Sequence, residues 1–174
     1  MSGVPLRILD FGGAAGVDFA NLLKSISDCP DVQYGVVDLP EVCVFGKRYW
    51  ADDRRLVFYD SMPQQGERFD LIYSSWALQY VDDPLALLEK FTAYHAKAIL
   101  IINVPFTRGA PFVRVQTNKM LRSWVLSLPD TEEVMRKNGY ALRFHVAGDV
   151  DHNVDNYAAE YRVSNVSNLL FLKL

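Results

Sequence analysis

Five short apolar runs constrain the fold more than any other feature of the sequence. The runs are Leu6–Asp10, Tyr34–Val37, Leu56–Tyr59, Phe69–Tyr73 and Ala98–Ile102, and the first four end at or just before an acid or a serine. Apart from Arg7, Asp10 and Asp70 they carry no charged residue and do not alternate, which is typical of strands buried on both faces by helices. The sequence therefore predicts a doubly wound α/β sheet.

Amphipathic segments separate these runs. Apolar residues recur at helical spacing after the first run, a helix with proline in its first turn is expected over Pro40–Tyr49, and Asp83-Pro84 is typical of a helix start. A helix over Asp130–Asn138, with Asp130 as its cap, precedes a late strand pair at Ala141–Val146 and Ser167–Leu172.

We read this late pair as an antiparallel addition at the edge of the sheet. The predicted architecture is a mostly parallel seven-stranded sheet with an antiparallel strand near the C-terminal edge and helices on both faces. At 174 residues, with no repeat or linker, the chain is expected to form one domain over 1–174.

A turn of very small residues follows the first strand. Asp10 and Phe11 precede Gly12-Gly13-Ala14-Ala15-Gly16 at the carboxyl edge, where open α/β sheets bind ligands. A nicotinamide fold would place a third glycine at position 17, which is Val17. Two more acids, Asp38 and Asp60, close the next two strands.

The pattern Asp10-x-Gly12-x-Ala14-x-Gly16 resembles the first motif of Rossmann-like S-adenosylmethionine-dependent methyltransferases. The segment F-D-L-I-Y-S-S-W-A-L-Q-Y-V-D-D-P is similar to their fourth-strand region. Together with L-D-F-G-G and F-V-R-V-Q, these segments look like a methyltransferase family associated with surface-polysaccharide biosynthesis. The resemblance implies S-adenosylmethionine as cofactor and methyl transfer as activity.

The resemblance also implies the cofactor site. Asp38 would accept hydrogen bonds from the ribose hydroxyls, Asp60 and Ser61 would lie beside the adenine, and the turn would present N–H groups to the methionine carboxylate. Asp10 suits the cofactor's ammonium group. The full set of expected cofactor residues is Asp10, Phe11, Gly12, Gly13, Ala14, Gly16, Asp38, Leu39, Asp60, Ser61, Ser74 and Ser75.

The sequence departs from the family pattern in two places. Ala14 replaces a glycine, and almost nothing precedes the first strand where relatives carry an N-terminal lid. We expect Gly12 and Gly13 to supply the unusual backbone angles of the turn, so that alanine at position 14 costs little.

Composition excludes several classes of function. The net charge is −3, the pI is near 5.6 and no basic cluster is present, which disfavours nucleic acid as a partner. No apolar stretch is long enough for a membrane span, and we expect a cytoplasmic protein. Cys29 and Cys43 have no spacing typical of a metal site, so no metal is expected.

The acceptor side carries weaker signals. A sugar hydroxyl would need a base, but His95 is placed at the wrong edge, His145 is interpreted as a packing residue and His152 lies in a polar loop, so no catalytic residue is assigned. Gln79, Asn103 and Arg108 are the candidate acceptor contacts. The absence of an N-P-P-Y or D-P-P-Y motif favours oxygen over nitrogen as the methylated atom.

Three hypotheses follow. The first is an S-adenosylmethionine-dependent methyltransferase with a small-molecule or saccharide acceptor. The second is a methyltransferase-like binding module without turnover, suggested by Ala14 and the lack of an evident base. The third, a nicotinamide oxidoreductase, is disfavoured by Val17. The sequence does not indicate an oligomeric state.

Overall fold

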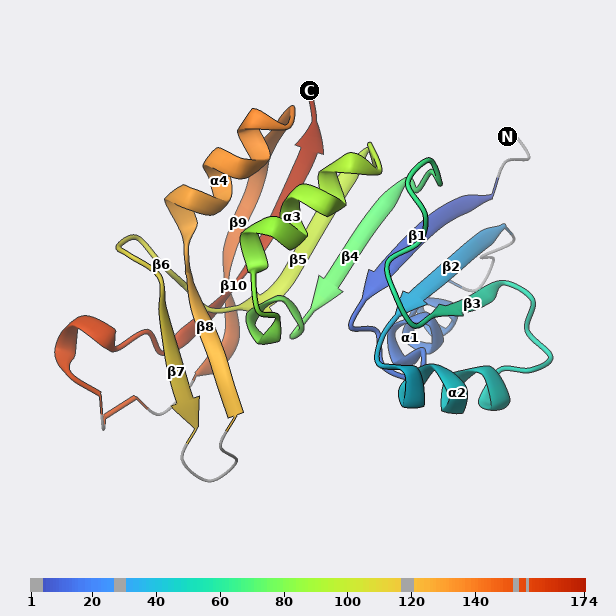
Figure 1. Ribbon diagram of the computed structural model, residues 1–174, viewed down its shortest axis with the longest axis horizontal. Coiled ribbons are helices and arrows are strands. Elements are labelled where there is room, and N and C mark those ends of the chain that lie inside the picture. Colours follow the sequence, from blue (N-terminus) through green and yellow to red (C-terminus); the bar gives the residue numbers. More distant parts are fainter. Residues whose placement is uncertain (1–4, 27–30, 117–120, 152–153, 156) are drawn as a thin grey trace.

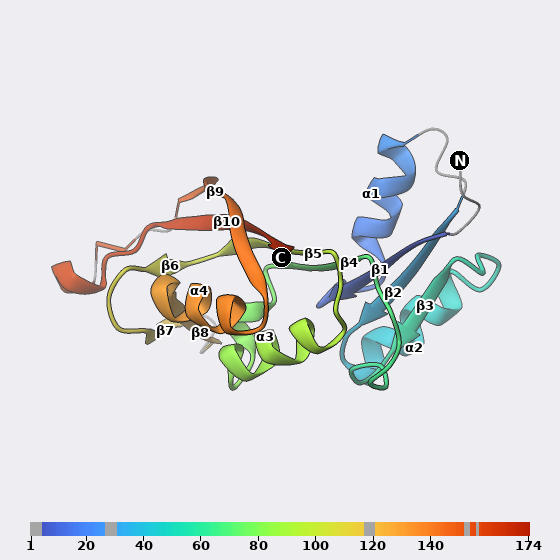
Figure 2. The ribbon, with the colours of Figure 1, turned by 90° about the horizontal axis from the view of Figure 1, so that it is seen from above.

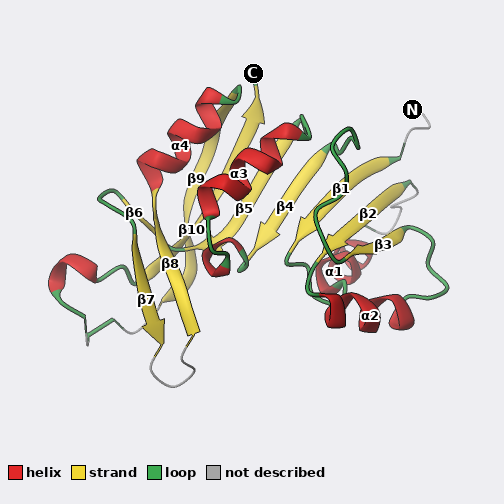
Figure 3. Cartoon of the chain, in the orientation of Figure 1, coloured by secondary structure: helices red, strands yellow, loops and turns green. Residues whose placement is uncertain are grey.

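The protein is a seven-stranded α/β sheet with a smaller sheet beside it (Figures 1 and 3). The computed structural model describes residues 5–26, 31–116, 121–151, 154–155 and 157–174. The strands are β1 (Leu6–Phe11), β2 (Val32–Val37), β3 (Leu56–Tyr59), β4 (Leu71–Ser75), β5 (Ala98–Val104), β6 (Phe106–Thr107), β7 (Phe112–Gln116), β8 (Leu121–Ser127), β9 (Tyr140–Asp151) and β10 (Asn165–Lys173). The α-helices are α1 (Val17–Ser25), α2 (Pro40–Tyr49), α3 (Pro84–Ala93) and α4 (Leu128–Lys137), and two short 3₁₀ helices are η1 (Leu78–Tyr80) and η2 (Ala159–Tyr161).

The strand order β3-β2-β1-β4-β5-β10-β9 confirms the predicted sheet. The first five strands in this order pair in parallel, and β10 runs antiparallel to both β5 and β9. Chain order reverses between β1 and β4, so the carboxyl ends of these two strands flank the ligand position of an open α/β sheet.

Helices cover both faces of the sheet, as the apolar strands predict. Phe19 of α1 and Cys43 of α2 are buried with Ile8 and Val36 on one face. On the other face α3 and α4 pack over a larger core that includes Phe91, and Figure 2 shows these two helices on the side of the sheet opposite α1. Among the described residues, no helix has the length and apolar character to cross a membrane.

Several predicted boundaries are wrong: β1, β2, β5, β9 and β10 are longer than predicted, and β4 and α4 begin at other residues. β4 begins at Leu71 instead of Phe69, because Asp70 lies before the ladder and accepts a hydrogen bond from the Arg7 N–H at 3.0 Å. α4 begins at Leu128 with Ser127 as its cap, whose hydroxyl accepts from the Asp130 N–H at 3.3 Å. Asp130 is therefore inside the first turn of α4 and is not the cap.

The three-stranded sheet β6-β8-β7 was not predicted. Its strands β7 and β8 pair antiparallel, and β8 leads directly into α4. The indole N–H of Trp124 in β8 donates to the Val81 carbonyl at 3.1 Å, which ties this sheet to the loop between η1 and α3.

The cap assignment predicts a difference between two neighbouring substitutions. Ser127→Ala removes the side chain that satisfies a first-turn N–H and should destabilise the protein by about 1 kcal/mol. Asp130→Asn removes only a charge near the helix N-terminus and should cost less than about 0.5 kcal/mol. Urea denaturation of both variants measures the difference, and a larger loss for Asp130→Asn would contradict the assignment.

Candidate functional site

The turn between β1 and α1 is built from residues with left-handed backbone angles. Gly12 has φ 75°, Ala14 φ 49° and Gly16 φ 86°. The Gly12 N–H donates to the Val37 carbonyl of the neighbouring strand at 2.8 Å. A Cβ atom on Gly12 would collide with the Cβ of Ala77, so the loop after β4 lies directly against this turn.

The expectation for Ala14 is wrong in part, since Gly12 has the unusual backbone angle expected of it. Gly13 is not among the residues with positive φ, and Ala14 itself adopts the left-handed conformation that Gly12 and Gly13 were expected to absorb. Its methyl group is exposed, so the cost is a backbone cost and not a packing cost. This conformation costs an L-residue roughly 1–2 kcal/mol.

Two side chains hold the turn in place, one just after β2 and one just after α2. Oδ2 of Asp38 accepts from the Ala14 N–H at 2.8 Å, and its Oδ1 accepts from the Leu39 N–H at 2.7 Å. The indole N–H of Trp50 donates to the Ala15 carbonyl at 2.8 Å. The predicted ribose acid is therefore in contact with the predicted glycine turn.

Asp10 lies beneath the turn and is fully buried. The Tyr34 hydroxyl donates to Asp10 Oδ2 at 2.8 Å, while Oδ1 has no hydrogen-bond partner among the described residues. A Cβ on Gly13 would collide with this carboxyl group. Burial raises the Asp10 pKa to about 7, against the lowering effect of the Tyr34 hydrogen bond. Gly13 therefore allows the turn to pack directly on the Asp10 carboxyl group.

The remaining predicted cofactor residues divide into accessible and buried groups. Asp60, Ser61 and Leu39 are exposed, and Leu39 retains 61% of its accessible surface. Phe11 and Ser75 are half-buried. Ser74 is buried inside β4 and its hydroxyl has no partner among the described residues. Ser74 therefore faces the interior and does not reach the open edge.

The predicted acceptor residues lie in different environments. Asn103, near the end of β5, has φ 60°, and its side-chain amide donates to the Ser75 hydroxyl at 3.5 Å. Gln79 is buried with Oε1 unpartnered among the described residues. Arg108 is exposed, and the nearby Arg114 is buried and donates to the Val163 carbonyl at 2.7 Å. Arg114 thus has a structural partner.

The histidines are placed away from the turn where they are described. His95 follows α3 at the opposite edge of the sheet. His145 is exposed on β9 with Nε2 3.1 Å from the Ser167 hydroxyl, so its interpretation as a packing residue is wrong. His152 and Cys29 lie outside the described residues. Cys43 is a buried free thiol.

Three residues that the sequence analysis did not assign to the site are Tyr34, Trp50 and Ala77. Each touches the turn or the acid below it from a distant part of the chain. No local pattern marks them, because their roles depend on strand order and helix placement. For Ala77, the only local indication of a contact with the turn is that a small residue follows S-S-W.

Comparisons with known proteins agree with this arrangement. A family model described as "Methyltransferase domain" matches residues 2–143. No curated protein sequence matches the chain.

Solved structures share the fold. A structure described as a pericyclic reaction enzyme has TM-score 0.65 and 19% identity over 99% of this chain and 44% of its own. The O-methyltransferase NcsB1 from neocarzinostatin biosynthesis, in complex with S-adenosyl-L-homocysteine and 1,4-dihydroxy-2-naphthoic acid, has TM-score 0.63 and 18% identity over 97% and 49%. An S-adenosylmethionine-dependent methyltransferase from Mesorhizobium loti has TM-score 0.65 and 18% identity over 98% and 92%. The chain thus spans less than half of the first two proteins.

The backbone of Ala14 generates a stability prediction. Ala14→Gly relieves the left-handed strain and, after the entropy cost of glycine in the unfolded chain, should stabilise the protein by up to about 1 kcal/mol. Ala15→Gly is the matched control, since Ala15 lies outside the left-handed region and should lose about 0.5–1 kcal/mol. Chemical denaturation measures both, and equal effects would contradict the backbone assignment.

The burial of Asp10 generates a pH prediction. The folded-state pKa near 7 lies above the ordinary value of 3.8, so the folded protein keeps a proton that the unfolded chain releases. This contribution to stability is complete below the ordinary pKa and is lost as pH rises through 7. When the pH is raised from about 5 to about 8, the free energy of unfolding of Asp10→Asn should rise by about 3 kcal/mol relative to that of the unmodified protein. Urea titrations at both pH values test this, with exposed Asp31→Asn as the control that should show no such gain.

Proposed function

The chain belongs to the methyltransferase domain family, and we propose that it transfers a methyl group from S-adenosylmethionine to an oxygen of a small-molecule or saccharide acceptor. The single observation that carries the site assignment is the contact of Asp38 with the Ala14 N–H. This contact joins two separately predicted motifs at the switch point between β1 and β4.

The residues at this edge fit S-adenosylmethionine. The first turn of α1 has no side-chain cap, so its N–H groups are available to a carboxylate. The backbone N–H groups of residues 12, 14 and 16 already donate to acceptors of the protein. The N–H groups proposed to bind the carboxylate are therefore those of the rest of the turn and of the start of α1. Gly12 and Gly16 have no room for side chains because Ala77 and Trp50 pack against them, which holds the turn close to the neighbouring elements.

Asp38 and Asp60 are proposed to recognise the nucleoside. Each Asp38 oxygen accepts one backbone N–H and keeps a lone pair for a ribose hydroxyl. Asp60 and Ser61 are exposed just beyond β3 and can accept from and donate to an adenine edge. Leu39 and Phe11 offer apolar surface beside these polar groups.

When bound, S-adenosylmethionine would supply the methyl group on its positively charged sulfur: a bond from the acceptor oxygen to the methyl carbon would form as the carbon–sulfur bond breaks, leaving S-adenosylhomocysteine, and the acceptor hydroxyl would lose its proton to solvent. Positioning provides much of the rate of such a displacement, so the site does not require an elaborate catalytic group. Asn103 is proposed to orient the acceptor, because its left-handed backbone at the carboxyl end of β5 and its contact with Ser75 fix its amide. Asp10 beneath the turn is proposed to stabilise the cofactor's ammonium through its negative charge.

A second candidate function is a binding module that holds the cofactor without turnover. The strained Ala14 and the lack of a histidine at the turn among the described residues favour it. An acceptor screen that follows S-adenosylhomocysteine release separates the two functions. Release with any saccharide or hydroxylated small molecule supports the enzyme.

Asp38→Asn should weaken S-adenosylmethionine binding while the protein stays folded. Loss of the charged acceptor should cost about 1.5–3 kcal/mol, or roughly tenfold to a hundredfold in the dissociation constant. Calorimetric titration measures this, with exposed Asp52→Asn as the matched control. Binding within about twofold of the unmodified protein, or binding of NAD in place of S-adenosylmethionine, would overturn the assignment.

A further inference from the structure

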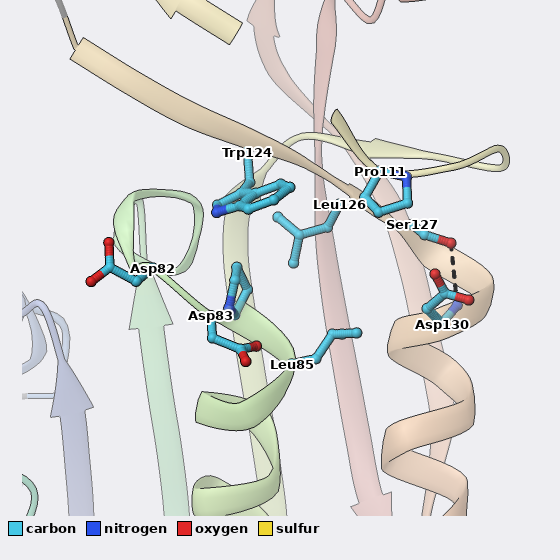
Figure 4. A pocket seen from close by; sticks show the side chains of 9 residues that line it. Asp82, Asp83, Leu85, Pro111, Trp124, Leu126, Ser127 and Asp130 are labelled. Atoms are coloured by element: carbon cyan, nitrogen blue, oxygen red, sulfur yellow. Dashed lines mark hydrogen bonds between the residues drawn. The ribbon is translucent and has the colours of Figure 1, made fainter. Parts of the chain in front are cut away.

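A cavity of about 290 Å³ lies outside the proposed cofactor site. It lies between the N-terminal ends of α3 and α4 and beneath β8, which passes above the start of α3 and continues into α4 (Figure 4). None of the residues expected to bind the cofactor lines it. Its size is near the lower limit of small-molecule sites and suits a ligand with a single ring.

The walls of the cavity are mostly apolar. Trp124 and Leu126 of β8 face Pro84 and Leu85 of α3, and Pro111 closes one side. The hydrogen bond from the Trp124 indole N–H to the Val81 carbonyl fixes the ring plane over the start of α3. A fixed indole next to buried Leu126 offers a preformed surface for an apolar ring.

The charged groups at the cavity are acidic, and Ser127 adds a hydroxyl group. Asp82, Asp83 and Asp130 are exposed at its rim, and the described lining includes no lysine or arginine. Oδ1 of Asp83 accepts the Ala86 N–H and leaves Oδ2 for a cation, whereas Figure 4 shows the Asp82 carboxylate turned away from Trp124 and Leu126, so the attraction of a cation is assigned mainly to Asp83 and Asp130. The indole face of Trp124 also attracts cations. A negatively charged ligand would meet repulsion from three carboxylates.

We infer that this cavity, formed by Trp124, Leu126 and Leu85 with Asp130 and Asp83 at its rim, is a binding site for a small molecule that combines one apolar ring with an amino group. The ring lies against Trp124 and Leu126, and the ammonium group lies toward the carboxylates. This site does not depend on the proposed methyl transfer, because its lining and its charge are separate from the glycine turn.

Three probes of similar size test the inference. Phenethylamine, phenethyl alcohol and phenylacetate share a ring and differ in charge. Heteronuclear NMR at neutral pH follows the indole N–H signals, with that of Trp124 assigned from Trp124→Phe. Phenethylamine should shift the Trp124 signal with a dissociation constant on the order of 1 mM. It should bind about tenfold more tightly than phenylacetate, with the alcohol between them.

Two variants sharpen the test. Asp130→Asn, at an exposed position, should reduce the preference for amine over alcohol, and Trp124→Ala should weaken both about tenfold. If Trp124→Ala does not fold, Trp124→Phe keeps the apolar wall and should still reduce amine binding. The Trp50 signal serves as an internal control, since its N–H is bonded to Ala15 at a separate place. An unshifted Trp124 signal, or phenylacetate binding as tightly as the amine, would overturn the inference.

Discussion

The contact between the β1–α1 turn and the end of β2 is the constraint on which the site depends. Asp38 accepts the Ala14 N–H, the Val37 carbonyl accepts the Gly12 N–H, and Trp50 binds the Ala15 carbonyl. These bonds come from the end of β2 and from residues just after β2 and α2. The shape of the turn therefore depends on contacts that the parallel pairing of β1 with β2 brings close. Ala77 then brings the loop after β4 against the same turn.

Much of the fold follows from local sequence patterns. The bounds of α2 and β3 are those predicted, because Pro40 sets a helix start and an apolar run between polar residues sets a strand. The Asp83 cap is also confirmed by its bond to the Ala86 N–H. The late antiparallel pair is confirmed by the pairing of β10 with β5 and β9. In each case residues close together in the chain carry the signal.

Other features depend on contacts that local patterns do not encode. The left-handed φ of Ala14 results from contacts that other elements make with the turn. The two glycines that precede Ala14 in the sequence therefore did not predict this angle. The cap of α4 is Ser127, three residues before the predicted cap Asp130. The alternation of apolar and polar residues in F-V-R-V-Q indicates a strand, but no local pattern shows that β8, further along the chain, is its partner.

The buried Asp10–Tyr34 pair has a consequence for the thermodynamics of ligand binding. A cation bound near the turn favours the charged form of Asp10. Near neutral pH, where part of the Asp10 population is protonated, binding of the cation therefore releases on average a fraction of a proton per molecule. The released proton is taken up by the buffer. The heat recorded on binding therefore includes the ionisation heat of the buffer, and titrations in phosphate and in Tris would give different enthalpies for the same complex.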